Sequence, residues 1–324
     1  MSALEEILAS SLPCRTVRED KLRGRLNHCY LVLTEDDAIR TKLCKMIAKI
    51  ALCPNGGCGE CDVCEKIDDG AYIALTVADK DKMSVEDVKL LIEDTFLTGF
   101  DGDLKAYVIT NMQGMNEKAQ NKFLKTLEEP SDGVVFILGA QSPRSVLATI
   151  FSRCKKLNFE GFTVEQLKET LEEETPWGVA RDGLDREEVI ERAAACAFGS
   201  YTRAKKLASD AEFARLFALV ADILLKMTDS KKLDEQLARL APYKNDLSAV
   251  LDMTETVLGL LLSGEGGEFG AIEGLKSTFD TASVVNSLGL VASAKRKVES
   301  NCNAQSVLDA LFLGILEVKY LCRR

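Results

Sequence analysis

The sequence predicts an α/β region followed by an all-α region, and two observations support this division. In the first 161 residues, short runs of β-branched and aromatic residues alternate with segments in which apolar residues recur every three or four positions. Strands that alternate with amphipathic helices in this way indicate an open parallel sheet. After Gly161 the helical period continues to the end of the chain, without a convincing strand.

The first half of the α/β region begins with one or two polar helices in residues 1–27. A helix should follow the first strand, because its apolar residues are Ile39, Leu43, Met46, Ile47 and Ile50. Ser84 and Asp87 have the spacing of a capping pair, so a second helix should begin there. The strands expected in this half are residues 29–33 and 72–77.

The second half of this region continues the alternation. A helix should begin at Asn116, carry Phe123 and Leu127 on its apolar stripe and stop before Pro130. A shorter helix is expected over 145–151. The strands expected here are residues 107–109, 134–138 and, at an edge of the sheet, 155–159.

The helical region is predicted to form two bundles. A break at 228–232 separates them, and the glycine cluster 264–270 is expected to be a loop inside the second. The resulting domain limits are 1–161, 162–230 and 231–324. The broad apolar faces of helices such as 247–262 fit a self-contained core and an oligomerisation surface equally well.

Four cysteines within twelve residues form the most specific motif. Cys53, Cys58, Cys61 and Cys64 are spaced C-x4-C-x2-C-x2-C, with three glycines and one proline between them. Such turn residues let the backbone bring four sulfurs to one point. Four thiolates leave no ligand position open, so the motif predicts a closed, structural Zn²⁺ site at 53–64.

Two other interpretations of this motif stay open. Disulfides are disfavoured, because the last three cysteines are too close in sequence to pair well and nothing in the sequence indicates export. An iron–sulfur cluster is the sharper alternative, because C-x4-C-x2-C resembles the plant-type ferredoxin run. That run takes its fourth ligand from far along the chain, whereas here the fourth cysteine follows two residues later.

Composition and charge exclude several classes of function. The N-terminus is acidic and helix-like, and no apolar run reaches membrane-spanning length, so we expect a cytoplasmic protein. The net charge of −10 argues against a broad nucleic-acid surface on this chain alone. His28 is the single histidine, which makes a hydrolytic triad improbable. The remaining cysteines should be ordinary buried thiols: Cys14, Cys29, Cys44, Cys154, Cys196, Cys302 and Cys322.

The turn at 34–41 occupies the place of a phosphate-binding loop in a nucleotide-binding α/β domain. Such a loop needs glycines and a lysine, but this turn has no glycine and carries three consecutive carboxylates, Glu35 to Asp37. Thr34 and Asp37 are instead spaced as a capping box for the following helix. Residues 110–111, after the next strand but one, are Thr-Asn, where a nucleotide hydrolase carries an acidic pair for Mg²⁺. We therefore expect no bound nucleotide.

These features together resemble the clamp-loader subunits of bacterial DNA polymerase III, a family of AAA+ proteins. The resemblance covers most of the first 210 residues, and its pieces occur in a specific order. The matching segments are 28–31, the four-cysteine motif, 121–130 (NKFLKTLEEP), 135–138, Pro143, 147–154 (LATIFSRC), 199–204 (GSYTRA) and, more faintly, 301–304 (NCNA).

The resemblance implies an AAA+ core at 1–161 with an embedded zinc module, a helical lid at 162–230 and a helical collar at 231–324. Within it, Ser152-Arg153-Cys154 matches the motif whose arginine reaches the ATP site of a neighbouring subunit. It implies a hetero-pentamer with gamma/tau-type motor subunits and a delta subunit, which loads the sliding clamp onto primed DNA. A non-catalytic subunit that supplies Arg153 in trans is the leading hypothesis. An ATP-hydrolysing gamma/tau-type motor subunit and an iron–sulfur protein are the alternatives.

Overall fold

The computed structural model describes residues 2–96, 104–175, 185–243, 246–263, 270–300 and 302–321. Most of the glycine loop expected at 264–270, residue 301 of the NCNA segment and Cys322 lie outside these ranges. The chain divides into two compact units, Met1–Gly161 and Phe162–Arg324. A further division of the second unit into lid and collar at residue 230 stays a prediction. Across the described ranges, no helix has both the length and the apolar character that crossing a membrane requires.

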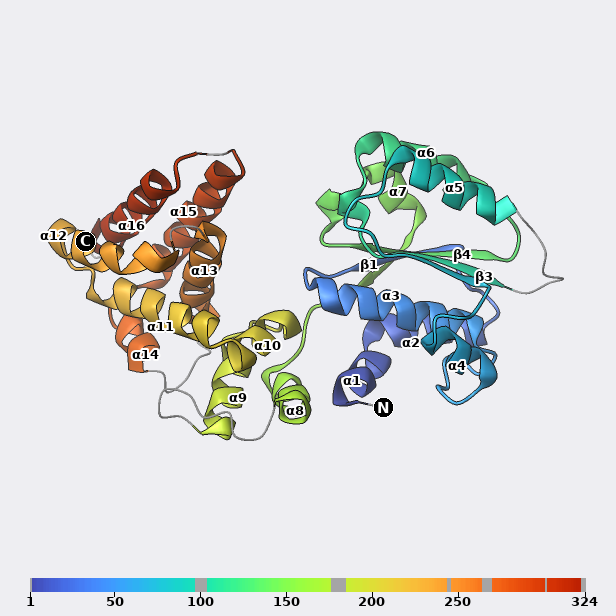
Figure 1. Cartoon of the computed structure of the whole chain (residues 1–324), viewed down its shortest axis with the longest axis horizontal. Coiled ribbons are helices and arrows are strands. Elements are labelled where there is room, and N and C mark those ends of the chain that lie inside the picture. The colour runs from blue at the N-terminus through green and yellow to red at the C-terminus, as the bar shows by residue number, and fades with distance from the viewer. Residues whose placement is uncertain are drawn as a thin grey trace. The chain divides into compact units, whose positions relative to one another are not determined.

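The first unit contains a five-stranded parallel sheet with helices on both of its faces (Figure 1). The strands lie in the order β2-β3-β4-β1-β5, so β5 is an edge strand, as predicted. The elements are α1 (Ala3–Ser10), α2 (Leu12–Leu22), β1 (Cys29–Leu33), α3 (Asp37–Leu52), α4 (Asp62–Asp68), β2 (Leu75–Ala78), α5 (Val85–Phe96), β3 (Lys105–Ile109), η1 (Met112–Gly114), α6 (Glu117–Glu128), β4 (Val134–Ala140), η2 (Pro143–Ser145), α7 (Ala148–Arg153) and β5 (Lys155–Asn158).

The three central strands are buried on both sides, which explains their continuous apolar composition. Alternate residues of these strands pack against α5, α6 and α7 in a core that centres on Phe136. The ring of Phe136 meets that of Phe123 edge to face, with centroids 5.0 Å apart, and lies 5.5 Å from that of Tyr107. Helices α2 and α3 cover the other face (Figure 1). The predicted α/β fold is therefore confirmed.

Local signals located most elements of this unit within a few residues. Asn116 caps α6 by accepting from the N–H of Ala119, as the sequence predicts. Ser84 and Asp87 exchange reciprocal hydrogen bonds before α5. The strand expected from residue 72 begins at Leu75, because the N–H of Leu75 closes a turn onto the carbonyl of Tyr72.

The second unit is helical in every described element. Lys319 of α16 is buried there, and its ammonium donates to the carbonyls of Leu224 and Met227 at the end of α11. These bonds satisfy carbonyls that the helix itself leaves without a partner. The elements are α8 (Val164–Glu174), α9 (Arg186–Ala195), α10 (Tyr201–Ser209), α11 (Ala211–Lys226), α12 (Ser230–Leu237), η3 (Ala238–Tyr243), α13 (Leu247–Ser263), α14 (Gly270–Lys276), α15 (Thr281–Glu299) and α16 (Ala304–Leu321).

Candidate functional site

The four-cysteine motif forms a tight knuckle between α3 and α4. Cys53 ends α3 and Cys61 begins α4, so two regular helices fix the outer parts of the loop. Gly57 has a φ of +84°, and a Cβ there would lie 3.0 Å from Cγ1 of Ile50. Only glycine fits both the left-handed conformation and the close approach to α3.

The four sulfurs of the knuckle gather at one point. All four Sγ atoms lie within 4.8 Å of one another. The Sγ–Sγ distances are 3.7 Å for Cys53 to Cys58, 3.6 Å for Cys53 to Cys61 and 4.0 Å for Cys58 to Cys64. A tetrahedral Zn²⁺ with Zn–S bonds of about 2.3 Å requires sulfurs about 3.8 Å apart. The cluster therefore has the geometry of a four-thiolate metal site.

The electrostatics of the knuckle also favour a cation. Burial acts to raise the pKa of Cys53, but backbone N–H groups of Cys58 and Gly57 outweigh it and lower that pKa to about 6. Burial, and hydrogen bonding with Cys53, raise the pKa of Cys64 to about 12. One thiolate is thus stable at neutral pH while a neighbouring thiol resists ionisation. A bound metal would supply the charge that lets all four ionise.

The described cysteines outside the knuckle follow the prediction with one exception, and Cys322 lies outside the described residues. Burial raises the pKa of the Cys14, Cys44 and Cys196 thiols, as expected for structural residues. Cys302, which the composition suggested would be buried, is exposed. It stands two residues before α16, in the connection after α15.

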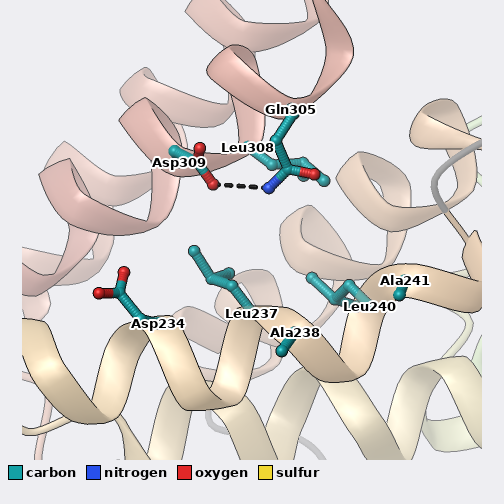
Figure 2. A pocket seen from close by; sticks show the side chains of 8 residues that line it. All are labelled: Asp234, Leu237, Ala238, Leu240, Ala241, Gln305, Leu308 and Asp309. Carbon is teal, nitrogen blue, oxygen red and sulfur yellow. Dashed lines mark hydrogen bonds between the residues drawn. The ribbon is translucent and has the colours of Figure 1, made fainter.

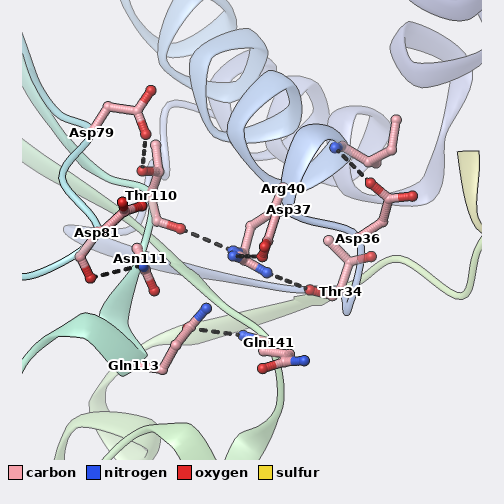
Figure 3. A network of polar contacts seen from close by, with 11 residues as sticks. Thr34, Asp36, Asp37, Arg40, Asp79, Asp81, Thr110, Asn111, Gln113 and Gln141 are labelled. Carbon is pink, nitrogen blue, oxygen red and sulfur yellow. Dashed lines mark hydrogen bonds and ion pairs between the residues drawn. The ribbon is translucent and has the colours of Figure 1, made fainter. Parts of the chain in front are cut away.

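The turn between β1 and α3 differs from the predicted capping box. Asp36, rather than Thr34, is the N-cap, and its carboxylate accepts from the N–H of Ile39. The carboxylate of Asp37, on the first turn of α3, pairs with the guanidinium of Arg40 (Figure 3). The chain thus satisfies the start of α3 with its own carboxylates.

Arg40 fills the space inside this turn, a role that the sequence pattern did not reveal. The residue is only 2% exposed, and its Nε donates to the carbonyl of Thr110 at 2.9 Å. Its Nη1 donates to the carbonyl of Thr34 at 3.0 Å (Figure 3). The guanidinium therefore ties the end of β1 to the end of β3.

A glycine on the neighbouring strand makes room for Arg40. A Cβ on Gly139 of β4 would lie 2.6 Å from the carbonyl oxygen of Thr110 and 2.9 Å from Cγ of Arg40. At the end of β3, the hydroxyl of Thr110 donates to Asp79 at 2.6 Å, and the amide of Asn111 donates to the carbonyl of Asp81 at 3.1 Å. Thr110 and Asn111 are thus tied to the loop that follows β2 (Figure 3).

Arg153 lies at the C-terminal end of α7 on the surface of the first unit. Its Nη2 is 2.6 Å from Oε1 of Glu128, and its Nη1 donates to the carbonyl of Thr149 at 2.8 Å. The side chain is 35% exposed, so the guanidinium can be reached from solvent. The flanking Ser152 is exposed and donates to the carbonyl of Thr149. Cys154 is buried, with its Sγ 2.8 Å from that of Cys29.

Gln120 connects the segment before Arg153 to the rest of the unit. This buried side chain donates to the carbonyls of Met112, Met115 and Ser145, and it accepts from the N–H of Leu147 at 2.9 Å. The loop after β4 is therefore fastened to α6 directly before α7 begins. No sequence pattern indicated this role, because a glutamine on a helix is ordinarily a surface residue.

The second unit contains a cavity of about 310 Å³ between α12, η3 and α16 (Figure 2). Leu237, Leu240 and Leu308 form its apolar wall, and the carboxylates of Asp234 and Asp309 lie at its rim. Gln305 donates to Asp309 at 2.8 Å across one turn of α16. The cavity holds no nucleophile or metal-ligand cluster, so it offers no evident chemistry.

Comparisons with known proteins agree with this architecture. Residues 14–163 match the family described as "DNA polymerase III, delta subunit". DNA polymerase III subunit delta' of Bacillus subtilis is 26% identical over 316 residues, which are 91% of this chain and 92% of that protein. DNA polymerase III subunit tau of Escherichia coli is 32% identical over 154 residues, which are 46% of this chain but only 24% of the tau subunit.

Two solved structures also align with the chain. A DNA polymerase III gamma subunit-related protein from Thermotoga maritima is 14% identical with a TM-score of 0.43, over 95% of this chain and 99% of that one. The Bacillus subtilis DNA clamp loader delta protein is 12% identical with a TM-score of 0.35, over 94% and 99%.

These sequence matches identify the chain as a relative of the clamp-loader subunits of bacterial DNA polymerase III. They support a delta-prime subunit in particular, because the match to subunit delta' covers nearly the whole of both chains. The match to tau, in contrast, spans about a quarter of that subunit.

Proposed function

We propose that this chain is a non-catalytic clamp-loader subunit that supplies Arg153 in trans to the ATP site of a neighbouring gamma/tau-type motor subunit. In this role it works inside a hetero-pentamer with the motor subunits and a delta subunit. The complex places the sliding clamp on primed DNA in the cytoplasm. The nearly full-length similarity to a delta-prime subunit supports this assignment.

The buried guanidinium of Arg40 is the observation that carries the non-catalytic part of the proposal. It donates to carbonyls at the ends of β1 and β3, so those carbonyls and the space between them are already in use. The turn offers carboxylates at positions 35–37 instead of a glycine cradle, and these repel phosphate. A triphosphate would have to displace a buried, hydrogen-bonded cation from a site with an acidic rim.

Arg153 suits a role in trans for physical reasons. Its guanidinium is permanently charged and planar, so it can bridge two phosphate oxygens. Its partner Glu128 has a side chain that is 47% exposed, so the ion pair is a surface pair worth at most about 1 kcal/mol. A phosphate of a neighbouring subunit can therefore replace Glu128 at small cost. Charge that develops on a transferred phosphoryl group is stabilised by such an arginine.

We also propose that the knuckle is a structural metal site, in which Zn²⁺ is held by Cys53, Cys58, Cys61 and Cys64. The sulfur spacing fits a tetrahedral ion, and four cysteines leave no position for substrate. The chain's own residues then contribute a fixed loop between α3 and α4 rather than a reactive centre. Metal analysis of the purified chain should give about one equivalent of zinc; iron with visible absorption would establish the iron–sulfur alternative.

An ATP-hydrolysing motor subunit is the second candidate, favoured by the 32% identity of the first half to tau. It requires that the chain bind nucleotide by itself. Titration of the isolated chain with a fluorescent ATP analogue and Mg²⁺ separates the two candidates. The proposal predicts no saturable binding at micromolar concentration, and saturable binding would replace it by the motor assignment.

The role of Arg153 is tested in a reconstituted complex with matching motor subunits. Adding the chain should stimulate ATP hydrolysis, and Arg153→Ala should remove the stimulation while leaving assembly intact. Arg144→Ala, on the nearby η2, is the matched control and should retain it. Stimulation that survives in Arg153→Ala would remove this residue from the mechanism.

A further inference from the structure

We propose that helix α2 couples the four-cysteine knuckle to the segment that carries Arg153, so that metal binding at the knuckle positions this arginine. The inference rests on the zinc site and the arginine role proposed above. Through this coupling, metal at the knuckle affects the position of Arg153, although the two are far apart in the sequence. Three side chains of α2 contact two different parts of the first unit: Arg18 and Lys21 bind the knuckle, and Asp20 binds the start of β5.

One side of α2 holds the knuckle through two cations. The ammonium of Lys21 donates to the carbonyls of Ile50 at 3.0 Å and Ala51 at 2.7 Å, and also to that of the metal-ligand residue Cys53. Nε of Arg18 donates to the carbonyl of Gly56 at 3.2 Å. Arg18 and Lys21 are three residues apart and so share one face of the helix. Together they bind the last turn of α3 and the start of the cysteine loop.

The positive charges of Arg18 and Lys21 also suit the charge of a metal-loaded knuckle. Four thiolates around one Zn²⁺ carry a net charge of about −2, which nearby positive groups stabilise. Lys21 and Arg18 bring two positive charges to the backbone of the cluster. A loaded knuckle should therefore hold α2 more firmly than an empty one.

Another side of α2 holds the beginning of β5. Asp20 is 9% exposed, and both of its carboxylate oxygens lie 2.7 Å from Nζ of Lys155. Oδ2 of Asp20 also accepts from the hydroxyl of Tyr30 at 2.9 Å. Tyr30 and Lys155 are register partners on β1 and β5. The carboxylate therefore joins α2 to both strands at one point.

Lys155 stands two residues after Arg153 and directly after the buried Cys154. The path from the knuckle to the arginine thus runs from Cys53 through Lys21 and Asp20 to Lys155. Its first step is the hydrogen bond from Lys21 to Cys53 and its last is the ion pair of Asp20 with Lys155, and the helix backbone joins Lys21 to Asp20. Asp20 and Lys21 are adjacent on a short helix, so a shift of α2 at the knuckle must also move the carboxylate. Coupling along this path is tested by measuring whether metal at the knuckle changes the segment around Arg153.

Hydrogen exchange of the full chain, measured with zinc bound and after zinc removal by a chelator, provides that measurement. Zinc removal should raise the exchange of amides at 149–158 by at least about threefold, since opening of this segment is then less opposed. Amides of α5, which has no bond to α2, are the internal control and should not change. If exchange rises only at 53–64, the coupling does not exist.

Variants of α2 distinguish coupling from a general loss of stability. In Asp20→Asn, exchange at 149–158 should be raised already, and zinc removal should add nothing. Lys21→Met should release zinc to a chelating dye several-fold faster than wild type, and Lys21→Arg should restore slow release. Lys66→Met, which alters an exposed lysine on α4, is the matched control and should release zinc at the wild-type rate.

The outcomes separate this inference from the proposed function. A wild-type response to zinc that persists unchanged in Asp20→Asn overturns the path through α2. Such a result leaves the ATP hydrolysis test of Arg153 unaffected. A chain that binds less than one equivalent of zinc overturns both the metal assignment and the coupling. Circular dichroism identifies any variant that fails to fold, and the wild-type comparison with and without zinc then decides alone.

Discussion

Replacing Arg40 by methionine should destabilise the first unit, because two buried carbonyls would lose their donor. The side chain donates to Thr110 and Thr34 from a position that is 2% exposed. An unsatisfied buried polar group costs about 1–3 kcal/mol, which gives about 2–6 kcal/mol for two. Removal of a buried charge offsets part of this cost. Asp37, the ion-pair partner of Arg40, has a side chain that is 80% exposed, so water solvates its carboxylate in the variant and its loss of a partner adds little to the cost. We expect a net loss of about 2–4 kcal/mol.

Urea unfolding followed by circular dichroism measures this loss, and hydrogen exchange of β1 amides assigns it to the first unit. Lys42→Met is the matched control, since it removes an exposed cation from the same helix and should change stability by less than about 0.5 kcal/mol. Gly139→Ala approaches the same contact from the strand side and should also destabilise. Equal stability of Arg40→Met and Lys42→Met would refute the view that Arg40 ties the strand ends together.

Three further results are expected. Protons compete with metal for all four thiolates of the knuckle, so the amount of zinc retained after dialysis should decrease as the pH falls from neutral towards 4. Constant zinc down to pH 4 would contradict this. Burial raises the pKa of Tyr30 and Tyr107, so their contribution to the free energy of unfolding is complete below about pH 10 and is lost above it. In urea unfolding, the free energy of unfolding should therefore decrease less above about pH 10 in Tyr30→Phe than in wild type. Glu128→Gln should release Arg153 and raise the stimulated hydrolysis rate by up to about fivefold, whereas a lower rate would mean that Glu128 positions the arginine.

The parts of the fold that the sequence predicted are those set by local chemistry. The buried strands of the sheet are continuous apolar runs, and Asn116 and Ser84 mark the starts of their helices by capping hydrogen bonds. The four-cysteine knuckle could also be predicted from the sequence, because its four cysteines lie within twelve residues of one another. The boundary at Asp36 was missed, because three consecutive polar residues can each supply an N-cap and only the backbone path selects one.

The parts that the sequence could not predict depend on distant contacts. Arg40 follows the apolar Ile39 on α3, and a long cationic side chain normally extends to solvent. Its acceptor, the carbonyl of Thr110, is 70 residues away in the chain. Asp20 and Lys155 are 135 residues apart. No periodicity links such pairs, so the closed turn and the path through α2 became visible only in three dimensions.

Single-turnover ATP hydrolysis by the assembled complex tests the central claim most directly. One hydrolysis phase should disappear when this chain is left out of the complex. That phase is assigned to the ATP site of the motor subunit next to this chain. With Arg153→Ala in the complex, the same phase should slow at least about 100-fold, while ATP affinity changes little, since an arginine in trans acts on the transition state. Hydrolysis at the wild-type rate in that phase, with the variant chain assembled, would contradict the account.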